Sequence, residues 1–265
     1  MLYGILQSNL SKSAYEYQEL MDSAKKYGII LDDSRCLNRS QYDFTLNRSY
    51  LEKCIGIQQG VQINDLANGY FWHNKSRQKQ LVLPCKVPKT IYGTNLTFNE
   101  CREQLGCPFV AKRSLSSGGC GVFKINTQED FDKATHCDIF QEMIWSSVGT
   151  DLRIWCLGGE IIGVMRRTNF DDFKANAHQG GKGSIYPINN TIQNIAKTIY
   201  NQTHLDIMGI DLLFSDKKDV YYFCELNVNP GFKEFDNTFN IHTADKIFEY
   251  INKKVNKNTI QNQIN

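Results

Sequence analysis

The chain has 265 residues and a mass of 30.5 kDa, which is long enough to bury a sizeable core. Its 41% hydrophobic and 22% charged residues exclude a disordered chain, and a formal charge of +2 carries no signature of nucleic-acid or membrane binding. No apolar run approaches the roughly 20 residues that cross a bilayer and no basic leader is present, so we expect a cytoplasmic protein. Nine cysteines, without C-x-x-C spacing, favour reduced thiols over disulfides or zinc.

The first third of the chain predicts a small α/β unit. Apolar spacing indicates a strand over 1–7, an amphipathic helix over 13–27 and a second strand over 29–31. The pattern is then weak as far as Tyr70, and the polar stretch 73–80 before two prolines is typical of a surface connection. We therefore expect a short N-terminal domain with its linker over 1–86.

The rest of the chain alternates between predicted helices and strands. Thr97 with Glu100 has the spacing of a capping box, and Thr127 is placed to cap a second helix. Helices are expected over 97–105, 127–135, 190–204 and 242–255, and strands over 109–112, 121–125, 139–144, 151–156, 160–166, 207–214 and 220–227. We divide this region into domains over 87–145 and 146–255, followed by a polar tail over 256–265.

A lysine and a glycine-rich segment indicate a phosphate site. Lys112 ends the strand 109–112, and the segment 114–121 that follows is rich in serine and glycine. Backbone N–H groups of such a turn can approach phosphate oxygens closely, and the lysine adds a positive charge. The alternative is a flexible hairpin tip with no ligand.

Acidic and amide side chains on the last two predicted strands indicate a metal site. Asp211 interrupts an apolar strand, where an unpaired carboxylate is costly. Glu225, Asn227 and Asn229 recur at period two and so share one face of the next strand. Oxygen ligands without sulfur or imidazole suit magnesium and disfavour zinc. The alternative is a hydrogen-bonded polar pair near a strand end.

Two further groups of residues carry weaker signals. Arginine is the bidentate choice for phosphate and carboxylate, although each arginine alone is more typical of a solvated surface. The strand end at Gln141–Ile144 could meet a purine, or be an ordinary hairpin entry. The group with the arginines comprises Arg153, Arg166, Arg167, Lys174, Asn176, His178, Gly180 and Gly181.

Together and in this order, four segments resemble the RimK-like branch of the ATP-grasp superfamily, over roughly residues 73–250. They are GTDLRIWCLGGEIIGVMRR, FKANAHQGG, IMGIDLL and FCELNVNPGF. The resemblance implies an α/β (α+β) ATP-grasp fold in which two subdomains clamp ATP, preceded by a short α/β domain. It also implies a ligase that joins a carboxylate to an amine through an acylphosphate.

The resemblance also implies roles for particular residues. ATP phosphates would be held by Lys75 and Lys112 under the loop that contains Ser117, Gly118, Gly119 and Gly121. Glu142 and Met143 would meet adenine, Asp151 the ribose, and Lys174, Ala175 and Asn176 the region near the phosphates. Two magnesium ions, replaceable by manganese, would bind Asp211, Glu225 and Asn227. Catalytic roles fall to Arg166 at the transferring phosphoryl group and to Arg153 and Asn229 at the acceptor carboxylate.

Two departures from the family pattern leave the substrate open. Lys174 replaces an arginine, which exchanges a bidentate fork for a point charge, and Cys120 stands where a small or polar residue is usual. We expect the partners to be an amino acid such as glutamate and a carboxylate on a peptide, protein or metabolite. The oligomeric state stays open, a homo-oligomer included. Alternatives are an ATP-grasp kinase of a small polyol and a catalytically silent ATP-binding regulatory module.

Overall fold

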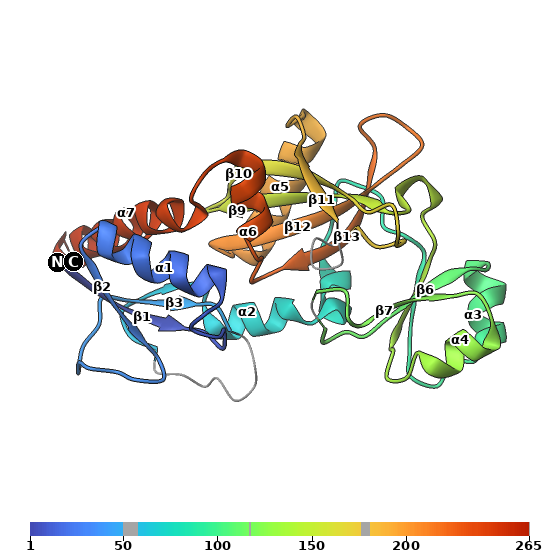
Figure 1. The fold of residues 1–265 in the computed structure, drawn as a ribbon, viewed down its shortest axis with the longest axis horizontal. Helices are drawn as coiled ribbons and strands as arrows, with labels where there is room; N and C mark the ends of the chain where they lie inside the picture. Colours follow the sequence, from blue (N-terminus) through green and yellow to red (C-terminus); the bar gives the residue numbers. More distant parts are fainter. Residues whose placement is uncertain (50–57, 117, 176–180, 265) are drawn as a thin grey trace.

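A computed structural model describes residues 1–49, 58–116, 118–175 and 181–264 of the chain, and these residues form three β-sheets with flanking helices. Figure 1 shows the three sheets following one another across the molecule, with the N-terminal sheet and the sheet of β6 and β7 at opposite ends. The two termini lie together at the outer end of the N-terminal sheet. The mixed α/β architecture expected from the sequence is confirmed.

The N-terminal sheet is parallel and has the strand order β2-β1-β3-β4. Helix α1 packs beside the C-terminal helix α7, so the end of the chain completes the first unit (Figure 1). Helix α7 runs as far as Ile264 and includes the segment that we expected to be a polar tail. The bounds of these elements are β1 Leu2–Gln7, α1 Tyr15–Lys26, β2 Ile29–Asp33, β3 Phe44–Asn47, β4 Val61–Ile63 and α7 Thr243–Ile264.

The sheet at the other end of the molecule is antiparallel and has the order β5-β8-β6-β7. The expected capping box at Thr97 with Glu100 is present, and the expected cap at Thr127 forms a capping box with Asp130. Phe98, Cys101 and Phe109 belong to the core between this sheet and its helices. The elements are β5 Thr90–Tyr92, α3 Phe98–Leu105, β6 Phe109–Lys112, β7 Val122–Ile125, α4 Gln128–Lys133 and β8 Ile139–Glu142.

The central sheet is antiparallel and has the order β11-β10-β9-β12-β13. Even-numbered residues of β9, such as Leu152 and Ile154, pack in one core with helix α5, while Trp155 on the opposite face packs with Phe232 and Phe235. The elements are β9 Thr150–Leu157, β10 Glu160–Thr168, β11 Lys182–Ile185, α5 Asn190–Thr203, β12 Ile207–Phe214, β13 Tyr221–Asn227 and α6 Lys233–Phe239. The connection from the first sheet contains α2 Leu66–His73 and the 3-10 helix η1 Lys75–Gln80, and η2 Trp145–Ser147 precedes β9.

Two irregularities break the register of this central sheet. The pairing of β10 with β9 shifts by one residue between Ile161 and Gly163. The pairing of β12 with β13 shifts between Asp211 and Leu212, which leaves Cys224 as the extra residue and places Glu225 opposite Asp211. Because a shift of one residue moves the following side chains to the other face, these bulges decide which side chains meet.

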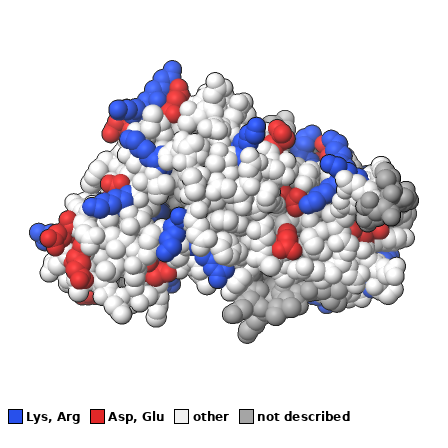
Figure 2. Space-filling model, turned by 180° about the vertical axis from the view of Figure 1, so that it is seen from behind, with Lys and Arg blue, Asp and Glu red and all other residues white. Residues whose placement is uncertain are grey.

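The surface charge and the cysteines give little specific information about function. Figure 2 shows basic and acidic side chains interspersed on the face opposite to that of Figure 1. Within the described ranges, no helix combines the length and the apolar character needed to cross a bilayer. The eight described cysteines are free thiols.

The buried amide of Asn64 is one of the links that fasten the N-terminal unit to the central sheet. Its Nδ2 donates to the carbonyl oxygens of Ile207 (2.7 Å) and Val228 (3.0 Å), and its Oδ1 accepts from the N–H of Ile207 at 2.7 Å. Asn64 is 1% exposed and has φ of 52°, a left-handed conformation that Asn tolerates better than other residues.

We expect Asn64→Ala to lower the free energy of unfolding by about 3 kcal/mol, because it leaves buried backbone groups unpaired and strains the backbone. Urea unfolding measures this loss. Asn99→Ala, on the exposed side of α3, is the control and should change stability by less than about 0.5 kcal/mol. Equal effects of the two substitutions would show that the Asn64 amide does not fasten the two units.

Candidate functional site

A cleft lies between the sheet of β5–β8 and the central sheet, and its space, open solvent included, is about 810 Å³. It collects most of the residues that the resemblance singles out. Eleven of them line it: Lys75, Lys112, Gly118, Gly119, Glu142, Met143, Asp151, Lys174, Ala175, Asp211 and Glu225. Ser117, Asn176, His178 and Gly180 lie outside the described residues.

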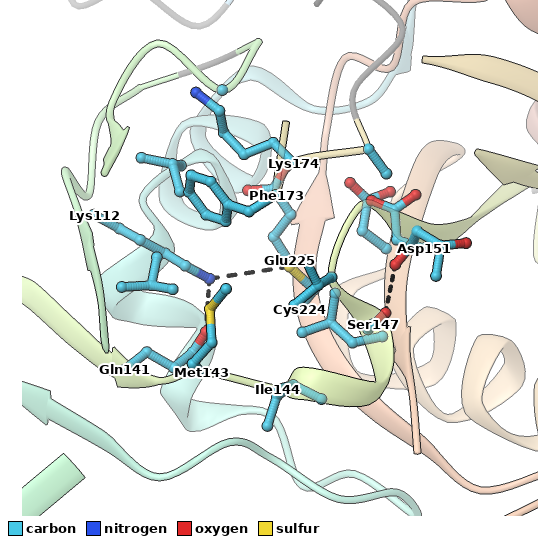
Figure 3. Close-up of a pocket in the computed structure, with 18 of the residues that line it drawn as sticks. Lys112, Gln141, Met143, Ile144, Ser147, Asp151, Phe173, Lys174, Cys224 and Glu225 are labelled. Atoms are coloured by element: carbon cyan, nitrogen blue, oxygen red, sulfur yellow. Dashed lines mark hydrogen bonds between the residues drawn. The ribbon is translucent and has the colours of Figure 1, made fainter. Parts of the chain in front are cut away.

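Lys112 brings a buried positive charge into the cleft from the end of β6. Its Nζ donates to Gln141 Oε1 at 2.7 Å and lies 3.9 Å from Cys224 Sγ (Figure 3). Burial raises the pKa of the Cys224 thiol to about 12, so both neighbours are neutral at physiological pH. In the part of the chain that the structure describes, no carboxylate lies within ion-pair distance of Lys112. Its charge is therefore available to an anionic ligand.

The glycine-rich segment is held over the cleft by Lys75. The Lys75 ammonium group donates to the carbonyl oxygen of Ser116 and lies 3.5 Å from Glu225 Oε2. Gly121 is not among the lining residues, but a Cβ at this position would meet the Cβ of Ser116 at 2.5 Å, so the turn requires glycine there. Gly118 has φ of 63°, which favours glycine as well.

Apolar side chains make up much of the remaining lining, and its charged side chains form hydrogen bonds or ion pairs with neighbouring residues. Met143 and Phe173 lie on either side of the Lys112 ammonium group (Figure 3). Glu142 accepts from the N–H of Lys89 at 2.7 Å, and the Lys174 ammonium group lies 3.6 Å from Asp172 Oδ2. An apolar slot beside buried cations suits a ligand with an aromatic part and an anionic part.

The oxygen ligands predicted for a metal meet at the inner end of this cleft. Asp211 and Glu225 are paired across β12 and β13, and Asn227 Nδ2 lies 3.3 Å from Asp211 Oδ2 and 3.2 Å from Glu225 Oε1. The described residues contain no cluster of three His, Cys, Asp or Glu side chains, so two carboxylates and one amide make up the donor set. These hard oxygen donors fit a magnesium ion bound together with phosphate.

Asp211 is fully buried and two arginines neutralise it. Arg153 contacts both of its oxygens, with Nη2 at 2.8 Å from Oδ2, and Arg167 Nη2 lies 3.0 Å from Oδ2. Burial alone would raise the pKa of Asp211, but the charges of Arg153 and Arg167 outweigh it and hold the pKa well below its usual range. Asp211 is therefore ionised at neutral pH.

Arg167, rather than Arg166, occupies the site face of β10. Arg167 is 4% exposed and forms a fork with Asp151, with Nε at 2.7 Å from Oδ1 and Nη2 at 2.6 Å from Oδ2. Arg166 is exposed, lies over the ring of Phe214 at 5.2 Å and donates to Thr150 Oγ1 at 3.2 Å. The structure therefore does not bring Arg166 to the other predicted residues.

A second cleft opens from the first one. Glu225 and Gly118 line both, so the two spaces meet at Glu225. The second cleft contains the predicted residues Arg153, Asn227 and Asn229, and the N-terminal unit contributes to its wall. Asn229 Nδ2 donates to the carbonyl oxygen of Arg48 at 2.6 Å. The other lining residues are Leu10, Glu16, Arg48, Met165, Arg167, Pro230, Gly231, Lys233, Glu234 and Phe235.

Sequence reasoning did not predict the positions that several side chains take in the first cleft. Gln141 orients Lys112 from the neighbouring strand β8, and Phe173 precedes the segment that carries Lys174. The one available signal for Gln141 was its position at a strand end. Phe173 and Cys224 stand in two of the four resembling segments, but no role was assigned to them, since an aromatic residue and a lone cysteine are ordinary core residues.

Comparison with known proteins identifies a family. The model of the RimK-like ATP-grasp domain matches residues 76–251. A probable alpha-L-glutamate ligase of Legionella pneumophila (strain Corby) is 32% identical over 157 residues, which are 56% of this chain and 51% of the relative. Beta-citrylglutamate synthase B of Danio rerio is 31% identical over 226 residues, which are 80% of this chain and 54% of the relative. The chain thus spans about half the length of these curated relatives.

Solved structures share the fold at low sequence identity. The ATP-grasp ligase PsnB, in complex with a phosphomimetic variant of its minimal precursor, Mg and ADP, has a TM-score of 0.72 at 13% identity, with 96% of this chain and 98% of that chain covered. D-alanine–D-alanine ligase of Bacillus anthracis has a TM-score of 0.67 at 14% identity, with 98% and 99% covered. These matches confirm the expected ATP-grasp fold. Since the family model covers well over half of its residues, this chain belongs to the RimK-like ATP-grasp family.

Proposed function

We propose that this chain is an ATP-dependent carboxylate–amine ligase. The observation that carries the proposal is the meeting of two clefts at Glu225, one lined by cationic and apolar side chains and the other by arginines and amides. A nucleotide in the first cleft would direct its terminal phosphate to this point. A carboxylate in the second cleft would reach the same point from the other side.

The nucleotide would be held mainly by charge and by shape. Lys112 and Lys75 supply positive charge for the phosphates, and the segment at Gly118 offers backbone N–H groups. Met143 and Phe173 supply an apolar slot for the base. Asp151 lines the same cleft and stays our candidate for the ribose.

Asp211, Glu225 and Asn227 would hold magnesium, which when bound neutralises charge on the phosphates that are being transferred. The family name implies ATP, and the related ligase PsnB was solved with Mg and ADP. The oxygen-only donor set supports magnesium or manganese over zinc. The two magnesium ions that the resemblance implies remain part of the proposal.

The reaction would proceed in two transfers that need no side-chain nucleophile. An oxygen of the acceptor carboxylate attacks the γ-phosphorus of ATP, which releases ADP and forms an acylphosphate. An amine then attacks the acyl carbon, so that an amide forms, and inorganic phosphate leaves with the C–O bond electrons and takes up the proton that the amine loses. Arg153 and Asn229 would orient the acceptor, and a closed glycine-rich segment would exclude water.

The relatives favour glutamate as the amine. One is named a glutamate ligase and another a beta-citrylglutamate synthase, and both names contain glutamate. Their names differ in the second component, so we propose a carboxylate-bearing small molecule, peptide or protein as the acceptor. An ADP-release assay with glutamate and a panel of such acids tests the proposal. Absence of amine-dependent ADP release across the panel would count against it.

Glu225→Gln should reduce ADP release by about 100-fold or more, because it removes one charged oxygen ligand at the junction of the clefts while keeping its shape. Glu129→Gln on the exposed side of α4 is the control and should leave the rate unchanged. A Glu225→Gln protein with the wild-type rate would reject the metal assignment.

Lys112→Gln should weaken binding of a non-hydrolysable ATP analogue about tenfold or more, because it removes a buried positive charge with which no described carboxylate forms an ion pair. Isothermal titration calorimetry without turnover measures this change. Lys133→Gln, an exposed lysine of α4, should bind the analogue like the wild type. Unaltered affinity in Lys112→Gln would place the phosphates elsewhere.

A further inference from the structure

Two arginines bind the same carboxylate of Asp211, but their surroundings differ in a way that separates their roles. Arg167 forms its fork with Asp151 and reaches Asp211 with one nitrogen only. Arg153 has no other acid partner among the described ion pairs, and both of its contacts are with Asp211. Arg167 is therefore anchored independently of Asp211, whereas Arg153 is not.

The two oxygens of Asp211 are also unequally occupied. Oδ2 accepts from Arg153 Nη2 at 2.8 Å, Arg167 Nη2 at 3.0 Å and Asn227 Nδ2 at 3.3 Å. The one described donor to Oδ1 is Arg153 Nε. Oδ1 therefore has fewer donors to displace than Oδ2, and a cation that binds there meets Arg153 rather than Arg167.

A divalent ion and a guanidinium group cannot share one carboxylate oxygen without strong repulsion. Magnesium binds oxygen at about 2.0–2.1 Å, which would put two positive groups within a few ångströms in a buried site. Arg167 cannot withdraw without breaking its fork with Asp151. Arg153 lines the second cleft and has 12% of its side chain exposed, so it has space to move into.

We propose that Arg153 is an exchangeable positioning residue, which pairs with Asp211 in the metal-free protein and is released into the second cleft when a divalent cation binds, where it pairs with the acceptor carboxylate. Arg167 stays in place and holds Oδ2. This inference rests on the proposed function and adds to it an order in which the ligands bind. The acceptor site becomes fully cationic only after the metal and nucleotide are in place.

The amide group of Asn227 turns over in the same exchange. Its Nδ2 now donates toward both carboxylates, which is the orientation that bridges two anions without a metal. As a metal ligand it must present its carbonyl oxygen instead, so its amide turns over. Both rearrangements remove hydrogen-bond donors from Asp211 while the cation replaces them. By linkage, the cation then raises the affinity for an anionic acceptor, and allosteric couplings of this kind are typically about 5- to 150-fold.

The test follows the two guanidinium groups directly, without turnover. In protein labelled with 15N-arginine, Arg153 and Arg167 should each give a protected Nε–H resonance in the metal-free state. Arg153→Lys assigns the first by its loss. Addition of MgCl2 with a non-hydrolysable ATP analogue should shift or remove the Arg153 resonance and leave the Arg167 resonance in place. The analogue with EDTA should leave both unchanged.

A second measurement uses Mn²⁺ as the probe. With the analogue present, electron paramagnetic resonance should show that Arg153→Gln binds Mn²⁺ at least about fivefold more tightly than the wild type, because the competitor is gone. Arg102→Gln on the exposed side of α3 is the control and should bind like the wild type.

The outcomes separate this inference from the proposed function. Mn²⁺ binding with an unchanged Arg153 resonance overturns the exchange and leaves the metal site standing. Release of Arg153 by the analogue in EDTA also overturns it, since the nucleotide and not the cation would be the trigger. No Mn²⁺ binding to the wild type overturns both the exchange and the metal assignment.

Discussion

The structure of the site depends on the cost of burying Asp211 in the face of an otherwise apolar strand. A carboxylate removed from water must be paired or must become protonated, and two arginines on β9 and β10 keep it ionised. Arg167 in turn is paired with Asp151 on β9. The pairing thus ties three neighbouring strands together at the point where the two clefts meet, so the chemistry is positioned by the sheet itself and not by a loop.

The register of two hairpins decides which residues take part in this pairing. If the turn at Gly158 and Gly159 were followed by regular pairing from Leu157 and Glu160 onward, Arg166 would stand opposite Asp151. The bulge before Gly163 shifts the pairs by one residue, so Arg167 faces Asp151 instead. Bulges are set by local packing that a single sequence does not display. The residue pattern therefore listed Arg166 and Arg167 together without distinguishing them, and the family resemblance assigned the role to Arg166.

Local signals and long-range contacts account for what the sequence could and could not predict. The capped helices after Thr97 and Thr127 were predictable because the cap and its partner lie three residues apart. Strands β3 and β4 have only four and three residues, and they form by pairing in parallel with β1 and with each other across long connections. In the site, motifs predicted which side chains line the cleft. Their partners, such as Gln141 for Lys112, come from tertiary pairing and were not predictable.

The charges at the junction bear on how a nucleotide and a metal would bind together. Among the described residues nearest Glu225, the cations Lys75, Lys112, Arg153 and Arg167 lie beside the carboxylates of Asp151, Asp211 and Glu225. A divalent cation alone would enter a region that already has an excess of positive side chains, and burial would strengthen the repulsion. A polyphosphate reverses this balance, because its negative charge offsets the lysines and leaves the carboxylates to the metal. Under the proposed function, the arginine pairing of Asp211 would therefore make metal binding conditional on the nucleotide.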